Sequence, residues 1–206
     1  MRFELIVAGF GGQGVIFAGQ LLARAGLAEG KNVVWTPSYG PEMRGGESQC
    51  SVVISSAPIG SPVVAEPEAA ILMDRAAAEK FAGQVTPGGL ILFNSSLVPD
   101  GLSREEVQCI GLPANEIAEE LGGPQVANLV LLGALLELRD AVAVETVRKV
   151  LAELLSSRKR HLLSVNEAAL ERGARAAREF VQQKPAHAQQ SKGAAARLPT
   201  PASLPS

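Results

Sequence analysis

The chain has 206 residues, of which 47% are hydrophobic and 19% are charged, so it can bury the core of one globular domain. Its formal net charge of -2 argues against nucleic acid or an anionic membrane as the main partner, because both favour a basic face. Two cysteines, Cys50 and Cys109, are too few for a disulfide scaffold or for an iron–sulfur cluster held by this chain alone. We expect both to be buried thiols.

The N-terminal segment carries Glu4 inside a short apolar stretch, which is unlike a signal peptide. No apolar run reaches the roughly 20 residues of a membrane span. The sequence therefore favours a cytoplasmic protein.

The beginning of the chain predicts a β-strand, a glycine turn and a helix. Residues 3–8 form an apolar run that ends in the glycine-rich segment 9–14. Apolar residues then recur at spacings of three and four from Val15 to Ala25, which is typical of a helix. Residues 32–35 predict a second strand, and such a unit normally crosses over to a parallel strand.

The rest of the chain continues as alternating strands and helices, after a polar loop predicted over 36–49. Strands are predicted over 50–55, 69–73, 90–93 and 107–112, and helices over 76–84, 126–138, 145–158 and 166–181. We interpret Asp74 and Asn166 as helix caps. The helix over 126–138 is apolar almost all round, so we expect it to be buried in the domain and against a partner.

This order of elements predicts an α/β fold: a mostly parallel sheet with a Rossmann-like βαβ start and helices on both faces. We assign residues 1–184 to this domain. Residues 185–206 are rich in proline, alanine, glutamine and serine without an apolar period, which predicts a disordered tail.

The first candidate site is the glycine segment, with Gly9, Gly11, Gly12, Gln13 and Gly14. It follows a strand and precedes a helix, where backbone N–H groups and the helix dipole favour an anion such as a phosphate. The alternative is that the glycines only permit a tight strand-to-helix turn.

Two familiar nucleotide sites lack their remaining parts. A nicotinamide-dinucleotide site usually has an acidic residue at the end of the second strand, but Trp35 is followed there by Thr36 and Pro37. A P-loop needs Lys and then Ser or Thr after the last glycine, where this chain has Val15 and Ile16.

The second candidate site lies in the segment 38–47, which holds Tyr39, the only tyrosine, and Arg44 followed by Gly45. An arginine between glycines can bind a phosphate or carboxylate through two hydrogen bonds. A loop of this length is more often functional than idle.

Together the segments Gly-Phe-Gly-Gly-Gln-Gly at 9–14 and Ser-Tyr-Gly-Pro-Glu-Met-Arg-Gly-Gly-Glu at 38–47 closely resemble the gamma subunit of 2-oxoacid:ferredoxin oxidoreductases. This family acts on pyruvate, 2-oxoglutarate, 2-oxoisovalerate or indolepyruvate. The resemblance continues through 61–64, 128–133 and 166–173, and it covers about residues 1–180.

The resemblance implies a subunit of a larger enzyme. Such an enzyme decarboxylates a 2-oxo acid on thiamine diphosphate, passes electrons through iron–sulfur clusters to ferredoxin and transfers the acyl group to coenzyme A. The thiamine and cluster sites are expected on partner subunits. This chain would then be non-catalytic, hold no metal, and contact coenzyme A at most, through the glycine segment and the loop with Tyr39, Arg44 and Gly45.

Two other functions remain open at this point. The glycine segment alone is compatible with a stand-alone NAD(P)-dependent dehydrogenase, although the acidic residue is missing. It is also compatible with a regulatory module that binds a small anion.

Overall fold

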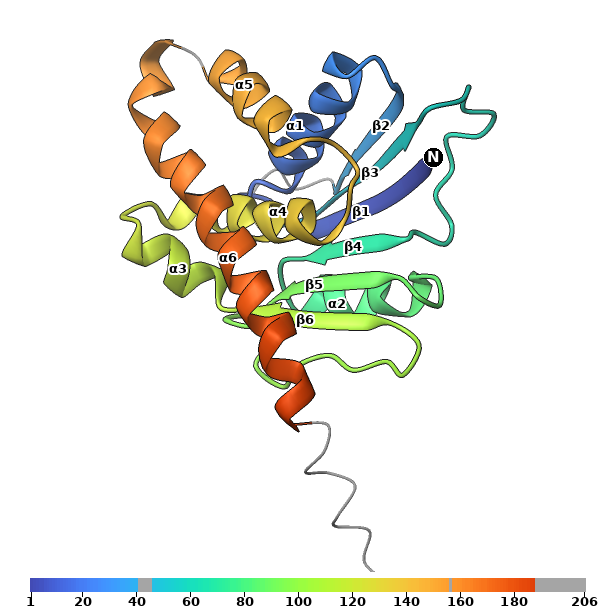
Figure 1. Cartoon of the computed structure of the whole chain (residues 1–206), viewed down its shortest axis with the longest axis vertical. Coiled ribbons are helices and arrows are strands. Elements are labelled where there is room, and N and C mark those ends of the chain that lie inside the picture. Colours follow the sequence, from blue (N-terminus) through green and yellow to red (C-terminus); the bar gives the residue numbers. More distant parts are fainter. Residues whose placement is uncertain (41–45, 156, 188–206) are drawn as a thin grey trace, which may run out of the picture.

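The computed structural model describes residues 1–40, 46–155 and 157–187, and it is built around a six-stranded sheet with the strand order β2-β3-β1-β4-β5-β6 (Figure 1). The strands are β1 (Arg2–Phe10), β2 (Asn32–Tyr39), β3 (Glu47–Ser55), β4 (Ala69–Leu72), β5 (Leu90–Asn94) and β6 (Gln108–Leu112). β1, β4, β5 and β6 are parallel neighbours, whereas β3 is antiparallel to both β1 and β2. The predicted mostly parallel sheet is confirmed.

The first helix does connect two strands that point the same way, but β3 lies between them. The predicted loop over 36–49 was too long. β2 continues to Tyr39, β3 begins at Glu47, and Tyr39 is opposite Ser48. Polar residues and Pro37 suggested a loop, but a strand at the edge of the sheet tolerates both, because one of its sides needs no hydrogen-bond partner.

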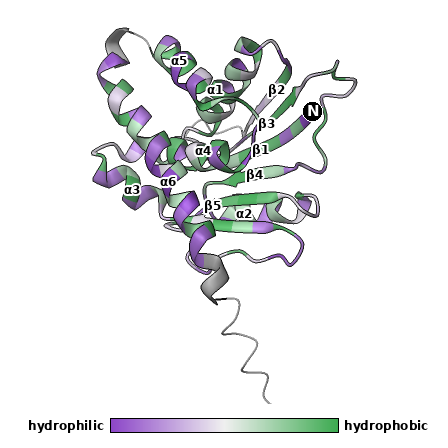
Figure 2. Cartoon of the chain, in the orientation of Figure 1, coloured by the Kyte–Doolittle hydropathy of each residue, from purple (hydrophilic) through white to green (hydrophobic). Residues whose placement is uncertain are grey.

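Helices cover both faces of the sheet, as predicted. They are α1 (Val15–Ala28), α2 (Arg75–Phe81), α3 (Ala114–Glu120), α4 (Ala127–Leu138), α5 (Val144–Leu154) and α6 (Leu163–His187). Side chains alternate along β1: Leu5 and Val7 join the core beneath α1 and α4, while Ile6 and Ala8 join the core beneath α2. In Figure 2 the hydrophobic colour is concentrated in the strands and on the inner sides of the helices.

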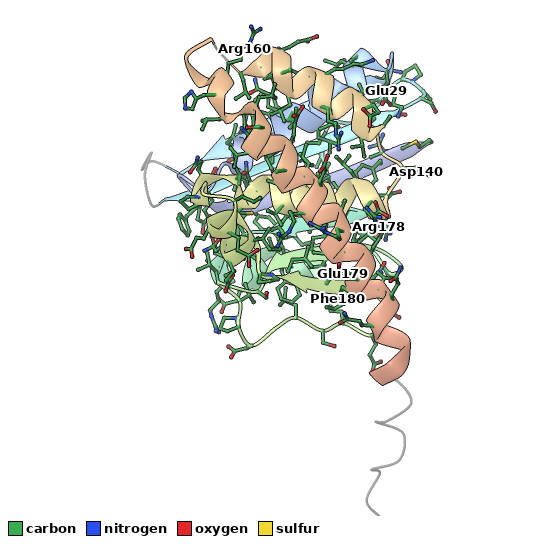
Figure 3. All side chains as sticks on the ribbon, turned by 60° about the vertical axis from the view of Figure 1, so that its left-hand side comes forward. Glu29, Asp140, Arg160, Arg178, Glu179 and Phe180 are labelled. Atoms are coloured by element: carbon green, nitrogen blue, oxygen red, sulfur yellow. The ribbon has the colours of Figure 1, made fainter. Side chains whose placement is uncertain are left out.

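The last helix crosses the molecule outside α4, and Figure 3 shows Arg178, Glu179 and Phe180 on its lower half. It begins at Leu163, so the predicted cap at Asn166 was wrong. The short 3-10 helix Ser157–Leu162 leads into α6, and the Asn166 side chain donates from Nδ2 to the Leu162 carbonyl at 2.6 Å. α6 includes residues 185–187 of the predicted tail, and the remainder, 188–206, lies outside the described residues.

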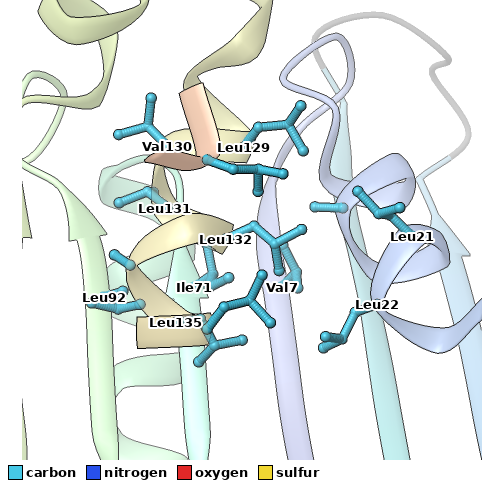
Figure 4. Packing of buried hydrophobic residues seen from close by; sticks show 14 of the residues in the cluster. Val7, Leu21, Leu22, Ile71, Leu92, Leu129, Val130, Leu131, Leu132 and Leu135 are labelled. Carbon is cyan, nitrogen blue, oxygen red and sulfur yellow. The ribbon is translucent and has the colours of Figure 1, made fainter. Parts of the chain in front are cut away.

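The apolar helix α4 lies between the sheet and α6. Leu132 and Leu135 are fully buried, and Figure 4 shows them packed beside Val7, Ile71 and Leu92 of the strands. The near-uniform apolar character of α4 is thus explained within this chain.

The crossing of α4 and α6 depends on two glycines. A methyl group on Gly133 would lie 2.7 Å from the carbonyl carbon of Leu170, and one on Gly173 would lie 2.7 Å from that of Val130. The backbones of the two helices therefore touch directly. Among the described helices, none is both long and apolar enough to cross a membrane.

Candidate functional site

The candidate site lies at the carboxyl ends of the parallel strands β1 and β4. β1 leads into α1 on one face of the sheet, and β4 leads into α2 on the opposite face. Neighbouring parallel strands whose helices diverge in this way leave a crevice between them, which is where open α/β sheets bind ligands. The predicted glycine segment forms one side of this crevice.

Gln13 fixes the shape of the loop between β1 and α1. Its Oε1 accepts a hydrogen bond from the Phe10 amide at 2.9 Å, and its Nε2 donates to the Met73 carbonyl at 3.5 Å. The Gln13 amide itself donates back to the Phe10 carbonyl at 3.2 Å. Gln13 therefore ties the loop to itself and to the end of β4.

The glycines of the loop differ in what they contact. A methyl group on Gly9 would lie 2.7 Å from Cβ of Met73, and one on Gly14 would lie 2.9 Å from Cγ of Asn128. Gly12, with φ of 111°, has no atom of the described residues within 4 Å of such a position. Close packing thus requires Gly9 and Gly14, whereas Gly12 faces open space.

The start of α1 offers unpaired backbone donors. Gly14 caps the helix in the left-handed conformation, and Asn128 donates from Nδ2 to the Gly14 carbonyl at 2.9 Å. Within the described ranges, the amides of Gly12, Gly14 and Val15 donate no hydrogen bond. Such amides at a helix N-terminus favour an anion or a carbonyl oxygen.

Two cavities flank the exposed Gly12. One, of about 470 Å³, is lined by Phe17, Gln20, Asn128 and other uncharged residues in or next to α1, α4, α5 and α6. The other, of about 380 Å³, extends towards α3, and Glu119 is the single charged residue among the described residues of its lining. No lysine or arginine among the described residues lines either cavity.

The second predicted segment approaches the glycine loop through the backbone. The Gly11 amide donates to the Gly46 carbonyl at 2.8 Å, so Gly46, the residue before β3, lies beside the loop. Tyr39 is the last residue of β2. Arg44 and Gly45 lie outside the described residues.

One polar residue of the crevice was not predicted to take part in binding. Asp74 follows β4, and its Oδ1 accepts a hydrogen bond from the Ala77 amide at 2.9 Å, which confirms the predicted cap on α2. Its Oδ2 is buried and has no hydrogen-bond partner among the described residues. The available signal was a single acidic residue at the end of an apolar strand, which does not distinguish a cap from a binding group.

The cysteines are both buried thiols, as predicted. Burial raises the pKa of Cys50 to about 11, despite the neighbouring Trp35 side chain and Gly19 backbone, which lower it. Over the described residues, no three His, Cys, Asp or Glu side chains gather in a way that could hold a metal ion.

A family model described as pyruvate ferredoxin/flavodoxin oxidoreductase matches residues 4–176. Among curated proteins, the 2-oxoglutarate synthase subunit KorC of Methanocaldococcus jannaschii is 41% identical over 156 residues, which is 74% of this chain and 83% of that protein. The ketoisovalerate oxidoreductase subunit VorA of Methanothermobacter marburgensis is 39% identical over 173 residues. That match covers 84% of this chain but only 36% of VorA, so the chain spans about a third of that relative.

Among solved structures, the chain resembles the gamma subunit of a keto/oxoacid ferredoxin oxidoreductase from Geobacter sulfurreducens. The TM-score is 0.76 at 30% sequence identity, over 87% of this chain and 98% of that one.

Proposed function

Since this chain belongs to the pyruvate ferredoxin/flavodoxin oxidoreductase family, we propose that it is the gamma subunit of a cytoplasmic 2-oxoacid:ferredoxin oxidoreductase. The complex would oxidise a 2-oxo acid to an acyl-coenzyme A and reduce ferredoxin. Thiamine diphosphate and the iron–sulfur clusters would be held by partner subunits. On its own the chain would have no activity.

The observation that carries this proposal is the match in fold to the gamma subunit from Geobacter sulfurreducens. The Geobacter protein is matched over 98% of its length, and no large part of it is left over for a further catalytic domain. VorA, by contrast, is much longer than the matched segment.

Within this complex we propose that the glycine loop contacts coenzyme A. Gly9, Gln13 and Gly14 would hold the loop in shape, while Gly11, Gly12 and the first amides of α1 would face the ligand. Tyr39, Arg44 and Gly45 would complete the site from the neighbouring β2–β3 connection. Exposed Gly12 and the unpaired amides support this assignment.

The order of the strands disfavours a stand-alone NAD(P)-dependent dehydrogenase. In that fold the second strand is next to the first, and an acidic residue at its end binds the ribose. Here β3 separates β2 from β1, and β2 ends in Tyr39. The end of β2 is therefore one strand farther from the glycine loop, and it carries no carboxylate.

Reconstitution tests the proposed complex. We expect no 2-oxo-acid-dependent dye reduction by the purified chain, and restored reduction after mixing with the thiamine- and cluster-bearing subunits. Robust turnover by the chain alone would contradict the proposal. Removal of 188–206 should leave assembly intact, because we propose that the domain ends before this tail.

A split assay tests the site. Arg44→Ala should raise the coenzyme A concentration needed for half-maximal rate by roughly ten- to hundredfold, the equivalent of one lost charge-assisted hydrogen bond. Carbon dioxide release from the 2-oxo acid should remain, because decarboxylation takes place on another subunit. Arg24→Ala, on an exposed position of α1, is the matched control. Unchanged coenzyme A dependence in Arg44→Ala would contradict the assigned role.

A further inference from the structure

A second, smaller cavity opens on the α2 side of the same crevice, and Asp74 is among its lining residues. This Asp74 pocket has a volume of about 190 Å³. It lies between the end of β1, the start of β3 and α2, with the rings of Phe10 and Phe81 among its walls. It is separate from the two cavities beside Gly12, which lie towards α3 and towards α5 and α6.

Asp74 is held rigidly in this pocket. Only 9% of the residue is exposed, and Oδ1 is fixed by the α2 cap. The other oxygen, Oδ2, is buried and accepts no hydrogen bond from the described residues. A buried carboxylate oxygen without a donor costs free energy, so a donor that reaches it would be strongly favoured.

Among the described residues, the other charges around the pocket do not neutralise Asp74. The Lys80 ammonium is 2.5 Å from a carboxylate oxygen of Glu47 and lies over the Phe81 ring, 5.3 Å from its centre. Lys80 and Glu47 thus offset each other, and the carboxylate of Asp74 leaves the described lining with one net negative charge. Both of these side chains are about half exposed or more, so they can move aside for a ligand.

The lining specifies what the ligand carries besides a positive charge. Ala8, Ala76 and Ala77 provide small apolar walls, and Phe10 is 42% exposed at the rim. The volume corresponds to about six water molecules at roughly 30 Å³ each, which suits one side chain and is too small for a nucleotide. An arginine or lysine, with an apolar stem and a cationic end, matches both features.

We propose that the Asp74 pocket receives a basic side chain from a partner subunit, whose cationic group donates to Oδ2 of Asp74. The identity of the partner rests on the proposed function, since a gamma subunit works within a complex. The exposed ring of Phe10 would pack against the same partner, next to the glycine loop. Docking there would place the partner at the mouth of the crevice.

The test is the affinity of reconstituted complexes that carry Asp74→Asn. Asparagine also caps helices, so α2 and the melting temperature of the isolated chain should be preserved. Loss of one member of a buried charge pair should weaken binding to the partner subunits by roughly thirtyfold or more. Asp100→Asn is the matched control. It makes the same substitution at an exposed carboxylate, which pairs with Arg75 of α2 and does not line the pocket.

A small probe separates a docking pocket from a metabolite pocket. Ethylguanidinium should shift the amide resonances of Phe10 and Ala77 in the wild-type chain but not in Asp74→Asn, and it should compete with the partner subunits. Equal affinity of Asp74→Asn and wild type for the partners would overturn the proposal, even if the probe binds. If wild type itself fails to assemble with such subunits, the proposed function has failed first, and the two failures are thereby distinguished.

Discussion

At the crossing of α4 and α6, Gly133 and Gly173 each face the backbone of the opposite helix, whereas Gly12, in the loop between β1 and α1, faces open space. In the first region the missing side chain allows two helices to touch. In the second it leaves a backbone exposed beside two cavities. Glycine therefore allows close packing of two helices in one region and leaves the backbone open to a ligand in the other.

The two regions meet at Asn128. This residue begins the segment of α4 that contains Gly133, and its side chain holds the Gly14 carbonyl at the start of α1. The crossing with α6 fixes the position of α4. It thereby also fixes where Asn128 contacts the glycine loop. Substitutions at the crossing should affect the whole domain, whereas substitutions at Gly12 should stay local.

The largest effect is expected from Gly173→Ala and Gly133→Ala. Each added methyl group would overlap a backbone carbonyl, which cannot rotate away as a side chain can. Overpacking typically costs about 1–3 kcal/mol, and a backbone collision falls at or above the upper end of this range. Urea denaturation measures the free energy of unfolding. Gly60→Ala is the control, because nothing lies within 4 Å of its added methyl group.

An ordinary surface substitution changes the free energy of unfolding by about 0.5 kcal/mol or less. If the free energies of unfolding of Gly173→Ala and Gly60→Ala differ by no more than this, the helices are not in direct backbone contact. The distinction between the two regions would then be lost.

A smaller effect is expected from Gly19→Ala, where the neighbour is a side chain. The added methyl group would overlap Sγ of Cys50 and lie 3.2 Å from Nε1 of Trp35. We expect a loss of about 1–3 kcal/mol. Because Cys50→Ala removes the obstructing sulfur, the double variant should be more stable than the sum of the two single effects. Strict additivity in this double-mutant cycle would contradict the packing described for Gly19.

The comparison also explains which features the sequence predicts. Gly-Phe-Gly-Gly-Gln-Gly between an apolar run and a helical period predicts its own local structure, because the turn is encoded within six residues. Gly133 contacts Leu170, 37 positions away, and Gly173 contacts Val130, 43 positions away, and no local pattern identifies which helices cross. The family resemblance includes the segments 128–133 and 166–173, which contain these two glycines. The structure shows that the two segments are in contact where α4 and α6 cross.

The errors in the prediction have a common physical cause. β2 and the insertion of β3 were misread because strand pairing satisfies polar residues that look like a loop in the sequence. Asn166 has the side chain of a helix cap, but its nearest acceptor is the Leu162 carbonyl inside a continuous helical segment. Asp74 was assigned as a cap, which is confirmed, yet the burial of its second oxygen arises only in the folded structure and has no local signal in the sequence.

Gly12→Ala should have a moderate and local effect. No atom obstructs the methyl group, so the cost is that of holding alanine at φ of 111°, roughly 1–3 kcal/mol. We expect a lower melting temperature with the amide spectra of α4 and α6 unchanged. Changes that spread to Gly133 and Gly173 would show that the loop and the crossing are coupled more tightly than their contacts suggest.

The smallest effect concerns the far end of α1, where Glu29 joins α1 to the start of α5. Its Oε1 accepts from the Ala143 amide at 2.6 Å, and its Oε2 is 2.7 Å from the Lys31 ammonium. Burial alone raises the pKa of Glu29, but hydrogen bonds from Lys31, Ala143 and Thr146 together lower it below the ordinary value of 4.5. The ionised carboxylate is thus favoured in the folded state.

A lowered pKa in the folded state means that the unfolded chain binds the proton more tightly. The contribution of Glu29 is therefore complete above the unfolded pKa near 4.5 and is lost as the pH falls through the lower, folded value. Glu29→Gln should be less stable than wild type at pH 7, and this difference should shrink as the pH falls below 4.5. Urea denaturation at pH 7 and at a pH below 4.5 measures the difference in the free energy of unfolding. Glu145→Gln, at an exposed position at the start of α5, is the control. If the difference is the same at both pH values, the ionised carboxylate does not stabilise the α1–α5 contact.

The same variant can be tested in the complex. If Glu29→Gln also loses coenzyme A dependence there, the two ends of α1 are coupled, and the local character assigned to the glycine loop is wrong.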